Sequence, residues 1–305
     1  MSLKERFEEN TAKQGVRRLK GYNTNIYLGY DDDGHMTVAI DEFGKKEKVT
    51  SSKFIKVVFV PRTDGKLLLM FSLTDRAYED IFLKFCSDLI GSCESAGPST
   101  AISCAVLRWK YWQSTFSKRK SEILSEIEIK GLIGELYVLK NWMYDRFGVS
   151  NSVKSWLGPL GGHKDYEIND TWYEVKSTNE GSIQITVSSL EQLEADNDGH
   201  LFVVRFEKTS ETSRDALDLN SIVSDISKTI TDPDIMDLFL ERMNASGYEY
   251  NDEYDAYKYH FKGMKLYSVN SEFPRLRKGE IHPAITKAEY TILIEGMAEF
   301  EEDLA

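Results

Sequence analysis

The spacing of apolar residues between Ser121 and Phe206 constrains the fold more than any other feature of the chain. An apolar stripe with helical spacing begins near Ser121 and continues to Leu139. It is followed by strand-like runs near 153–156, 164–168, 171–177 and 183–187, the capping-box pattern Ser188-x-x-Glu191, and a buried-type strand at 201–206. A helix followed by several short strands folds into a sheet covered by helices, so we predict an α/β or α+β fold.

The first third of the chain has a different pattern. Residues 22–73 alternate in the manner of strands, with turn signals at 31–34 and 64–65, and residues 76–92 have helical spacing. The sequence E-S-A-G-P-S-T at 94–100 is small, polar and broken by Gly-Pro, which is typical of a linker. We therefore predict an N-terminal β-rich domain at 1–95 and a second domain at 96–305. In the second domain we expect helices at 101–114 and 219–245, and strands at 258–269 and 289–295.

Charge, cysteine content and apolar runs limit the kinds of binding site and partner that we expect. The net charge of −12 is distributed as 0 over residues 1–100, +2 over 101–176 and −14 over 177–305. This balance argues against tight non-specific DNA binding by a lone protein, but it allows a locally basic cleft or a basic partner. Three cysteines without a Cys-x-x-Cys pair predict neither a disulfide framework nor a zinc site. Apolar runs too short for a bilayer and a charged start predict a cytoplasmic protein with no membrane contact.

The strand-like run at 171–177 contains the strongest candidates for catalytic residues. Glu174 and Lys176 are two residues apart, so both leave one face of a strand while Val175 turns into the core. Asp165 is expected at the end of the preceding strand, where a short turn brings it beside Glu174. Two close carboxylates repel each other unless a divalent cation lies between them, and Mg²⁺ prefers such oxygen ligands. The alternative is a surface Glu/Lys pair with an unrelated aspartate.

Several motifs in a fixed order accompany this pattern. They are Gly131-Leu-Ile-Gly-Glu135-Leu, Trp156-Leu-Gly-Pro159, Gly-His-Lys-Asp165-Tyr, Tyr-Glu174-Val-Lys176-Ser-Thr and Ile185-Thr-Val-Ser-Ser-Leu-Glu-Gln192. Together they resemble the PD-(D/E)XK nuclease superfamily, and in particular its DUF4420 family. The resemblance implies a restriction-endonuclease-like α-β-β-β-α-β core within 121–206, with a central mixed sheet flanked by helices. It also implies that Asp165, Glu174 and Lys176 are catalytic, although Lys164 replaces the proline of the signature.

The resemblance extends to a cofactor, further residues and partners. It implies Mg²⁺, with Mn²⁺ as a substitute, at Asp165, Glu174 and Val175. Glu135 and Gln192 match acidic and amide positions near the site in relatives, with a helix surface as the alternative for each. Weaker candidates for nucleic-acid contact are Ser177, Thr178, Lys118, Arg119 and Lys120; the last three also fit a solvated helix end.

The implied function is Mg²⁺-dependent DNA cleavage in a prokaryotic restriction or phage-defence system, with DNA, an ATPase or translocase, and a methyltransferase as partners and an oligomer possible. The alternatives are a non-catalytic nucleic-acid-binding or assembly subunit that retains the fold, and an RNA nuclease.

Overall fold

A computed structural model gives the fold of the chain in two compact units, Met1–Ser121 and Glu122–Ala305. The structure describes residues 2–9, 14–43, 46–113, 116, 123–195, 197–210, 212–213, 215–282 and 284–304. Lys118, Arg119 and Lys120 lie outside these described residues, so their predicted role stays a prediction. Each unit is described separately below.

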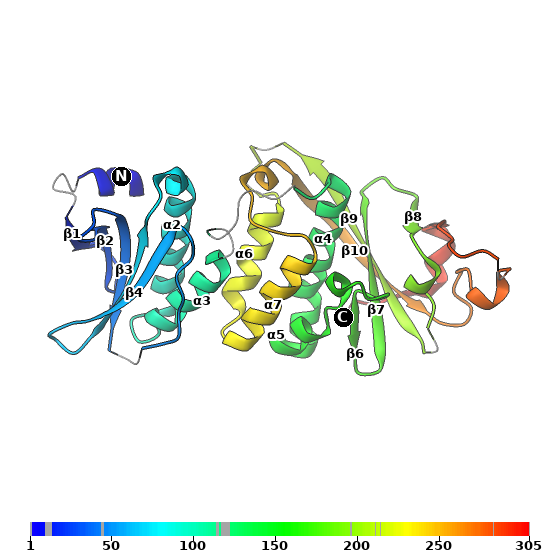
Figure 1. Cartoon of the computed structure of the whole chain (residues 1–305). Helices are drawn as coiled ribbons and strands as arrows, with labels where there is room; N and C mark the ends of the chain where they lie inside the picture. Colours follow the sequence, from blue (N-terminus) through cyan, green and yellow to red (C-terminus); the bar gives the residue numbers. More distant parts are fainter. Residues whose placement is uncertain are drawn as a thin grey trace. The chain divides into compact units, whose positions relative to one another are not determined.

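The N-terminal unit is an antiparallel sheet with two helices packed on one side, as Figure 1 shows. The strand order is β1-β2-β3-β5-β4, and a core that includes Phe71, Phe85 and Trp109 fills the space between sheet and helices. Its elements are α1 (Leu3–Glu8), β1 (Gly15–Arg18), β2 (Ile26–Tyr30), β3 (Met36–Glu42), β4 (Ile55–Pro61), β5 (Leu67–Leu73), η1 (Arg76–Tyr78), α2 (Glu79–Ala96) and α3 (Ala101–Gln113). The predicted β-rich start is confirmed.

The division between units differs from the predicted one. Residue 95 lies inside α2, and the predicted linker reduces to the turn between α2 and α3. The Cys93 thiol of α2 donates to the Ala101 carbonyl of α3, and the Trp109 indole N–H of α3 donates to the Thr50 carbonyl in the segment between β3 and β4. Residues 96–113 therefore pack with the N-terminal unit, since α3 completes the apolar cover of its sheet.

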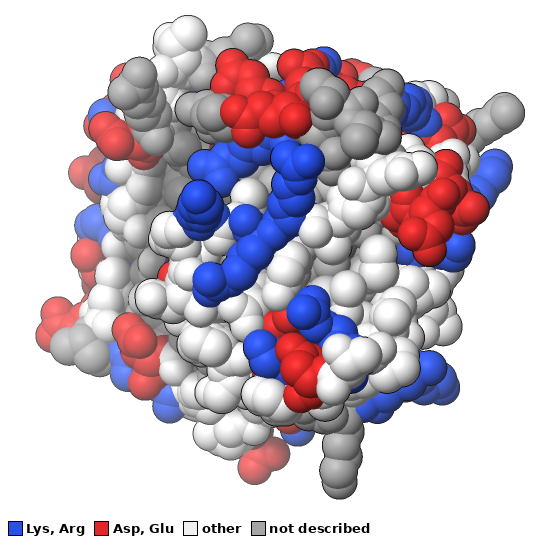
Figure 2. Space-filling model, turned by 90° about the vertical axis from the view of Figure 1, so that its left-hand side faces the viewer, with Lys and Arg blue, Asp and Glu red and all other residues white. Residues whose placement is uncertain are grey.

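The charged groups on the N-terminal unit are partly paired among themselves. Figure 2 shows Lys and Arg side chains lying together across a largely uncharged area on the side where the strands of this unit lie. Within the unit, Arg62 and Lys66 each lie 3.3 Å from the almost fully buried carboxylate of Asp41. That carboxylate also accepts from the Tyr27 hydroxyl and the Asn25 amide. Some of the basic charge on this unit thus stabilises an internal carboxylate.

The second unit contains the predicted mixed sheet flanked by helices, which confirms the fold class. The strand order is β12-β10-β9-β7-β6, with β7 and β9 parallel and the other pairs antiparallel. A two-stranded sheet of β8 and β11 packs against one face, and Figure 1 shows α4 and α5 on the other side of the strands.

The elements of the second unit are α4 (Glu126–Val138), the π-helical turn η2 (Leu139–Met143), α5 (Tyr144–Ser155), η3 (Gly158–Leu160), β6 (Tyr166–Ile168), β7 (Thr171–Asn179), β8 (Gln184–Val187), η4 (Leu190–Gln192), β9 (Gly199–Thr209), α6 (Leu219–Thr229), α7 (Pro233–Ala245), η5 (Asp252–Ala256), β10 (Lys258–Val269), η6 (Lys278–Glu280), β11 (Tyr290–Leu293), η7 (Glu295–Phe300) and β12 (Glu301–Glu302). Among the helices of the described residues, none is both long and apolar enough to cross a membrane.

Two local predictions for this unit are wrong, and a third is confirmed with one added detail. Residues 153–155 end helix α5, and only Trp156 forms a β-bridge, because a short apolar run fits either a helix or a strand. The helical prediction for 219–245 is confirmed, and the segment consists of two helices, α6 and α7, since Asp232 and Pro233 start a new one. The capping box at Ser188 does not form: η4 begins after Ser189, without a side-chain cap.

Candidate active site

The β6–β7 hairpin places Asp165 beside the middle of β7. Asn169 and Asp170 form its two-residue turn with positive φ values of 54° and 59°, which short polar side chains tolerate. Asp165 directly precedes β6, rather than ending a strand as predicted. Its Oδ2 accepts from the Val175 amide at 2.7 Å, and its carbonyl accepts from the Leu157 amide at 2.7 Å. The aspartate is therefore fixed on both its backbone and its side chain.

Glu174 and Lys176 form an ion pair on the face of β7 that is turned toward η4. Lys176 Nζ lies 2.8 Å from Glu174 Oε1 and donates to Gln192 Oε1, also at 2.8 Å. The same amide oxygen accepts from the Ser188 backbone N–H at 2.8 Å. Glu174 is 2% exposed, so its carboxyl group is separated from solvent. The structure thus brings Gln192 to the predicted catalytic pair and fixes the Lys176 ammonium between two oxygens.

Glu135 approaches the cluster from helix α4. Its Oε2 accepts from the Trp156 indole N–H at 2.7 Å, and its backbone carbonyl accepts from the Tyr166 hydroxyl at 2.7 Å. A Cβ added at Gly158 would lie 2.9 Å from Glu135 Oε2 and 2.9 Å from Asp165 Oδ1. Only glycine therefore fits at residue 158, because the two carboxylates converge on the space beside its backbone. Trp156, Gly158 and Tyr166 come from the quoted motifs, but their contacts with Glu135 were not predicted.

Burial raises the pKa of all three carboxyl groups, and repulsion from Asp165 adds to this for Glu174 and Glu135. Burial, followed by repulsion from Asp165, raises the pKa of Glu174 to about 8, against the attraction of Lys176. Burial raises the pKa of Asp165 to about 6, although Lys176 and the Val175 amide oppose this. Burial and then Asp165 raise the pKa of Glu135 well above its usual value. Such clusters of perturbed carboxyl groups occur at functional sites, because a catalytic or metal-binding role requires this arrangement.

Lys164 is a positioning residue that sequence reasoning passed over. It is 5% exposed, and its ammonium donates to the carbonyls of Glu191, Gln192 and Glu194 at 2.7, 2.8 and 3.0 Å. The same ammonium lies 3.8 Å from the centre of the Trp172 ring, and burial lowers its pKa to about 8. Lys164 thereby ties η4, which carries Gln192, to the hairpin that carries Asp165. From the sequence, Lys164 was recognised only as the residue that replaces the proline of the signature.

A comparison with protein families shows which family the chain belongs to. The model of the family described as putative PD-(D/E)XK family member (DUF4420) matches residues 5–295. The chain belongs to this family. No curated protein and no solved structure matches it. Membership in DUF4420 confirms the resemblance seen in the sequence, and it agrees with the mixed sheet and with an acidic pair and a lysine on neighbouring strands.

The carboxylates of this DUF4420 chain suit a hard divalent cation, which PD-(D/E)XK families typically use. Asp165 Oδ1 turns to the space beside Gly158, while Oδ2 is held by Val175. The mutual repulsion that raises the carboxyl pKa values is what a cation would relieve. Within the described ranges, however, the one trio of His, Asp or Glu with ligand atoms within 4.8 Å of one another is Asp31, Asp33 and His35 in the N-terminal unit. Asp165, Glu174 and Glu135, all within those ranges, do not form such a trio, so a metal at Asp165 and Glu174 would be held by two carboxylates.

The three remaining predicted residues of β7 differ in where they lie relative to the cluster. Ser177 points from β7 toward Gly134 of α4, on the face opposite Glu174 and Lys176, so the structure does not bring it to the cluster. Thr178 is on the same face as Lys176 and is buried. The Val175 side chain is buried, and its amide supports Asp165. The roles of these three residues stay predictions.

Proposed function

We propose that this protein is a Mg²⁺-dependent DNA endonuclease of a prokaryotic restriction or phage-defence system, acting in the cytoplasm. The observation that carries the proposal is the Lys176 ammonium held at 2.8 Å by both Glu174 and Gln192, beside a half-buried Asp165, in a chain of a PD-(D/E)XK family. Family membership supports a possible nuclease. The substrate, the metal and the system are our proposal.

In this proposal Asp165 and Glu174, with the Val175 backbone beside them, would hold Mg²⁺ or Mn²⁺. A bound ion of this kind polarises a phosphoryl oxygen and lowers the pKa of a coordinated water. Lys176 has three donor hydrogens, and Glu174 and Gln192 take two of them. The third can orient the attacking water or stabilise charge on the phosphate in the transition state. Burial and repulsion from Asp165 raise the pKa of Glu135 well above its usual value, so this carboxyl group can hold a proton next to Asp165.

One observation favours a second candidate, a non-catalytic nucleic-acid-binding or assembly subunit. Residues 177–305 carry a net charge of −14, which disfavours DNA on much of the second unit. The complete Asp165, Glu174 and Lys176 cluster favours catalysis. A protein that had lost its activity would no longer be under selection to keep such a buried ion pair.

The test is cleavage of supercoiled plasmid DNA, and of a matched RNA, with Mg²⁺ or Mn²⁺. We expect wild type to cut DNA and Asp165→Ala and Lys176→Ala to lose at least ~100-fold in rate, in line with removal of an electrostatic stabiliser. Lys154→Ala changes an exposed lysine and is the matched control. Cleavage retained in both site variants would refute the site.

Calorimetric titration with Mg²⁺ separates the remaining outcomes. A wild type that binds the metal through Asp165 but does not cut would require a partner subunit, such as an ATPase, a translocase or a methyltransferase. A wild type that neither cuts nor binds metal would favour the non-catalytic subunit.

A further inference from the structure

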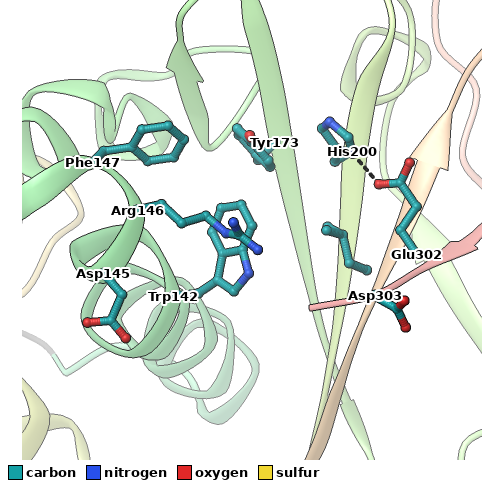
Figure 3. A pocket seen from close by; sticks show the side chains of 9 residues that line it. Trp142, Asp145, Arg146, Phe147, Tyr173, His200, Glu302 and Asp303 are labelled. Carbon is teal, nitrogen blue, oxygen red and sulfur yellow. Dashed lines mark ion pairs between the residues drawn. The ribbon is translucent and has the colours of Figure 1, made fainter. Parts of the chain in front are cut away.

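A cavity lies in the second unit, on the face of β7 opposite Glu174. It has a volume of about 530 Å³, within the range of small-molecule sites. Trp142 from η2, Phe147 from α5, Tyr173 from β7 and His200 from β9 line it (Figure 3). Because Tyr173 and Glu174 are consecutive in a strand, they point to opposite faces, so this cavity is separate from the candidate active site.

The walls of the cavity are flat aromatic rings. The rings of Tyr173 and His200 stack with centroids 5.0 Å apart and planes 17° apart. Trp142 lies 5.4 Å from Tyr173 and 6.2 Å from Phe147, and Leu266 adds an apolar side chain. Figure 3 shows these rings around the opening, with the Arg146 side chain across Trp142. Such walls favour a planar ligand that can stack on an aromatic face.

The polar groups of the cavity require a ligand that both accepts and donates hydrogen bonds. Trp142 is 7% exposed, and its indole N–H is buried with no acceptor among the described residues. A buried donor of this kind is costly unless a ligand supplies an acceptor. Three carboxylates also line the cavity: Asp145, Asp303, and Glu302, which pairs with His200 at 3.0 Å. These acids accept hydrogen bonds and repel anions.

We propose that this cavity binds a neutral, planar heteroaromatic compound with an exocyclic amino group, of the nucleobase type. A ring nitrogen or carbonyl would accept from the Trp142 N–H, and the amino group would donate to a rim carboxylate. A simple ammonium or guanidinium has no acceptor for Trp142, and the Arg146 guanidinium already lies 4.2 Å from the centre of that ring. A phosphate would face the three carboxylates. The proposal does not depend on nuclease activity.

The test is calorimetric titration of the full chain in EDTA, without DNA, with adenosine, cytidine, uridine, AMP and agmatine as probes. We expect adenosine or cytidine to bind saturably, uridine about ten-fold more weakly because it has no amino group, and AMP more weakly than adenosine. Trp142→Phe retains an aromatic ring but removes the N–H, and should weaken binding about ten-fold.

Asp303→Asn tests the acidic rim, and Asp225→Asn, on α6, is its matched control. Asp303 is exposed, so this pair keeps the proposal testable if Trp142→Phe does not fold. Binding weakened by Asp303→Asn alone would support the assignment. Absence of nucleoside binding, equal affinity for uridine, tighter binding of AMP, binding of agmatine alone, or unchanged affinity in both Trp142→Phe and Asp303→Asn would overturn it.

Discussion

Gly134 on α4 provides a sharp test of how the candidate site is held together. The helix approaches β7 so closely there that a Cβ on Gly134 would overlap Ser177 Oγ and lie 3.2 Å from Ser177 Cβ. Gly131, one turn earlier on the same helix, has no atom within 4 Å of the Cβ it lacks. The two glycines of the Gly131-Leu-Ile-Gly134 motif therefore differ only in what an added methyl group meets.

The two substitutions should change stability in opposite directions. An alanine in a helix interior gains about 0.5–1 kcal/mol over glycine, and Gly131→Ala should show this gain. At Gly134 the same gain is opposed by overpacking against Ser177, which costs about 1–3 kcal/mol. Because neither the helix nor the strand can retreat without moving the buried neighbours, we expect a net loss of about 1–2 kcal/mol for Gly134→Ala.

Urea denaturation followed by circular dichroism measures both effects. The double variant Gly134→Ala/Ser177→Gly should recover part of the loss, since it removes the Oγ and Cβ that the new methyl group meets. If Gly134→Ala proves as stable as Gly131→Ala, the close contact of α4 with β7 is wrong, and with it the placement of Glu135 beside Asp165.

Three further predictions concern the charged groups of the site. Lys164→Met leaves three backbone carbonyls without their donor and should cost about 3 kcal/mol in urea denaturation, whereas Lys154→Met at an exposed position should be nearly neutral; equal effects would remove the anchoring role of Lys164. The pKa of Glu174 rises from 4.5 to about 8 on folding, so the folded protein holds a proton that the unfolded chain releases. Its metal-free stability should therefore fall as pH rises from about 4.5 to 8, and Glu174→Gln should remove about 5 kcal/mol of that fall; an unchanged pH profile would contradict the burial of this carboxyl group. Mg²⁺ should raise the Tm more at pH 8 than at pH 6, since both carboxyl groups must lose protons to bind it, and Asp165→Asn should abolish the shift; a shift kept in that variant would place the metal elsewhere.

Local periodicity accounts for most of the elements that were predicted correctly. β2 to β5 and β7 have alternating or continuous apolar runs bounded by turn residues, and α2 and α3 have a clear helical stripe. Residues 153–156 were misassigned because Val153 and Trp156, both fully buried, have a spacing of three that suits the last turn of a helix. Such short runs are settled by what they pack against, which the sequence does not show.

The Ser188 pattern failed for a different reason. A capping box needs the serine side chain to accept from an amide of the following turn. Here the backbone N–H of Ser188 donates instead to the Gln192 side chain, whose oxygen is also held by Lys176 from another strand. The contact of Gln192 with Lys176 of β7 thus fixes this turn, in place of a cap by the serine side chain.

The sequence by itself determined that Glu174 and Lys176 share one face of a strand and that acidic, amide and glycine motifs surround them in a recognisable order. This follows from the two-residue period of a strand, which needs no knowledge of the rest of the chain. Only the tertiary structure decided that Lys164 holds η4, that Trp156 holds Glu135, that Ser177 faces away, and that an aromatic cavity lies behind Glu174. These relations join residues from separate elements, and their geometry depends on how the helices pack against the sheet.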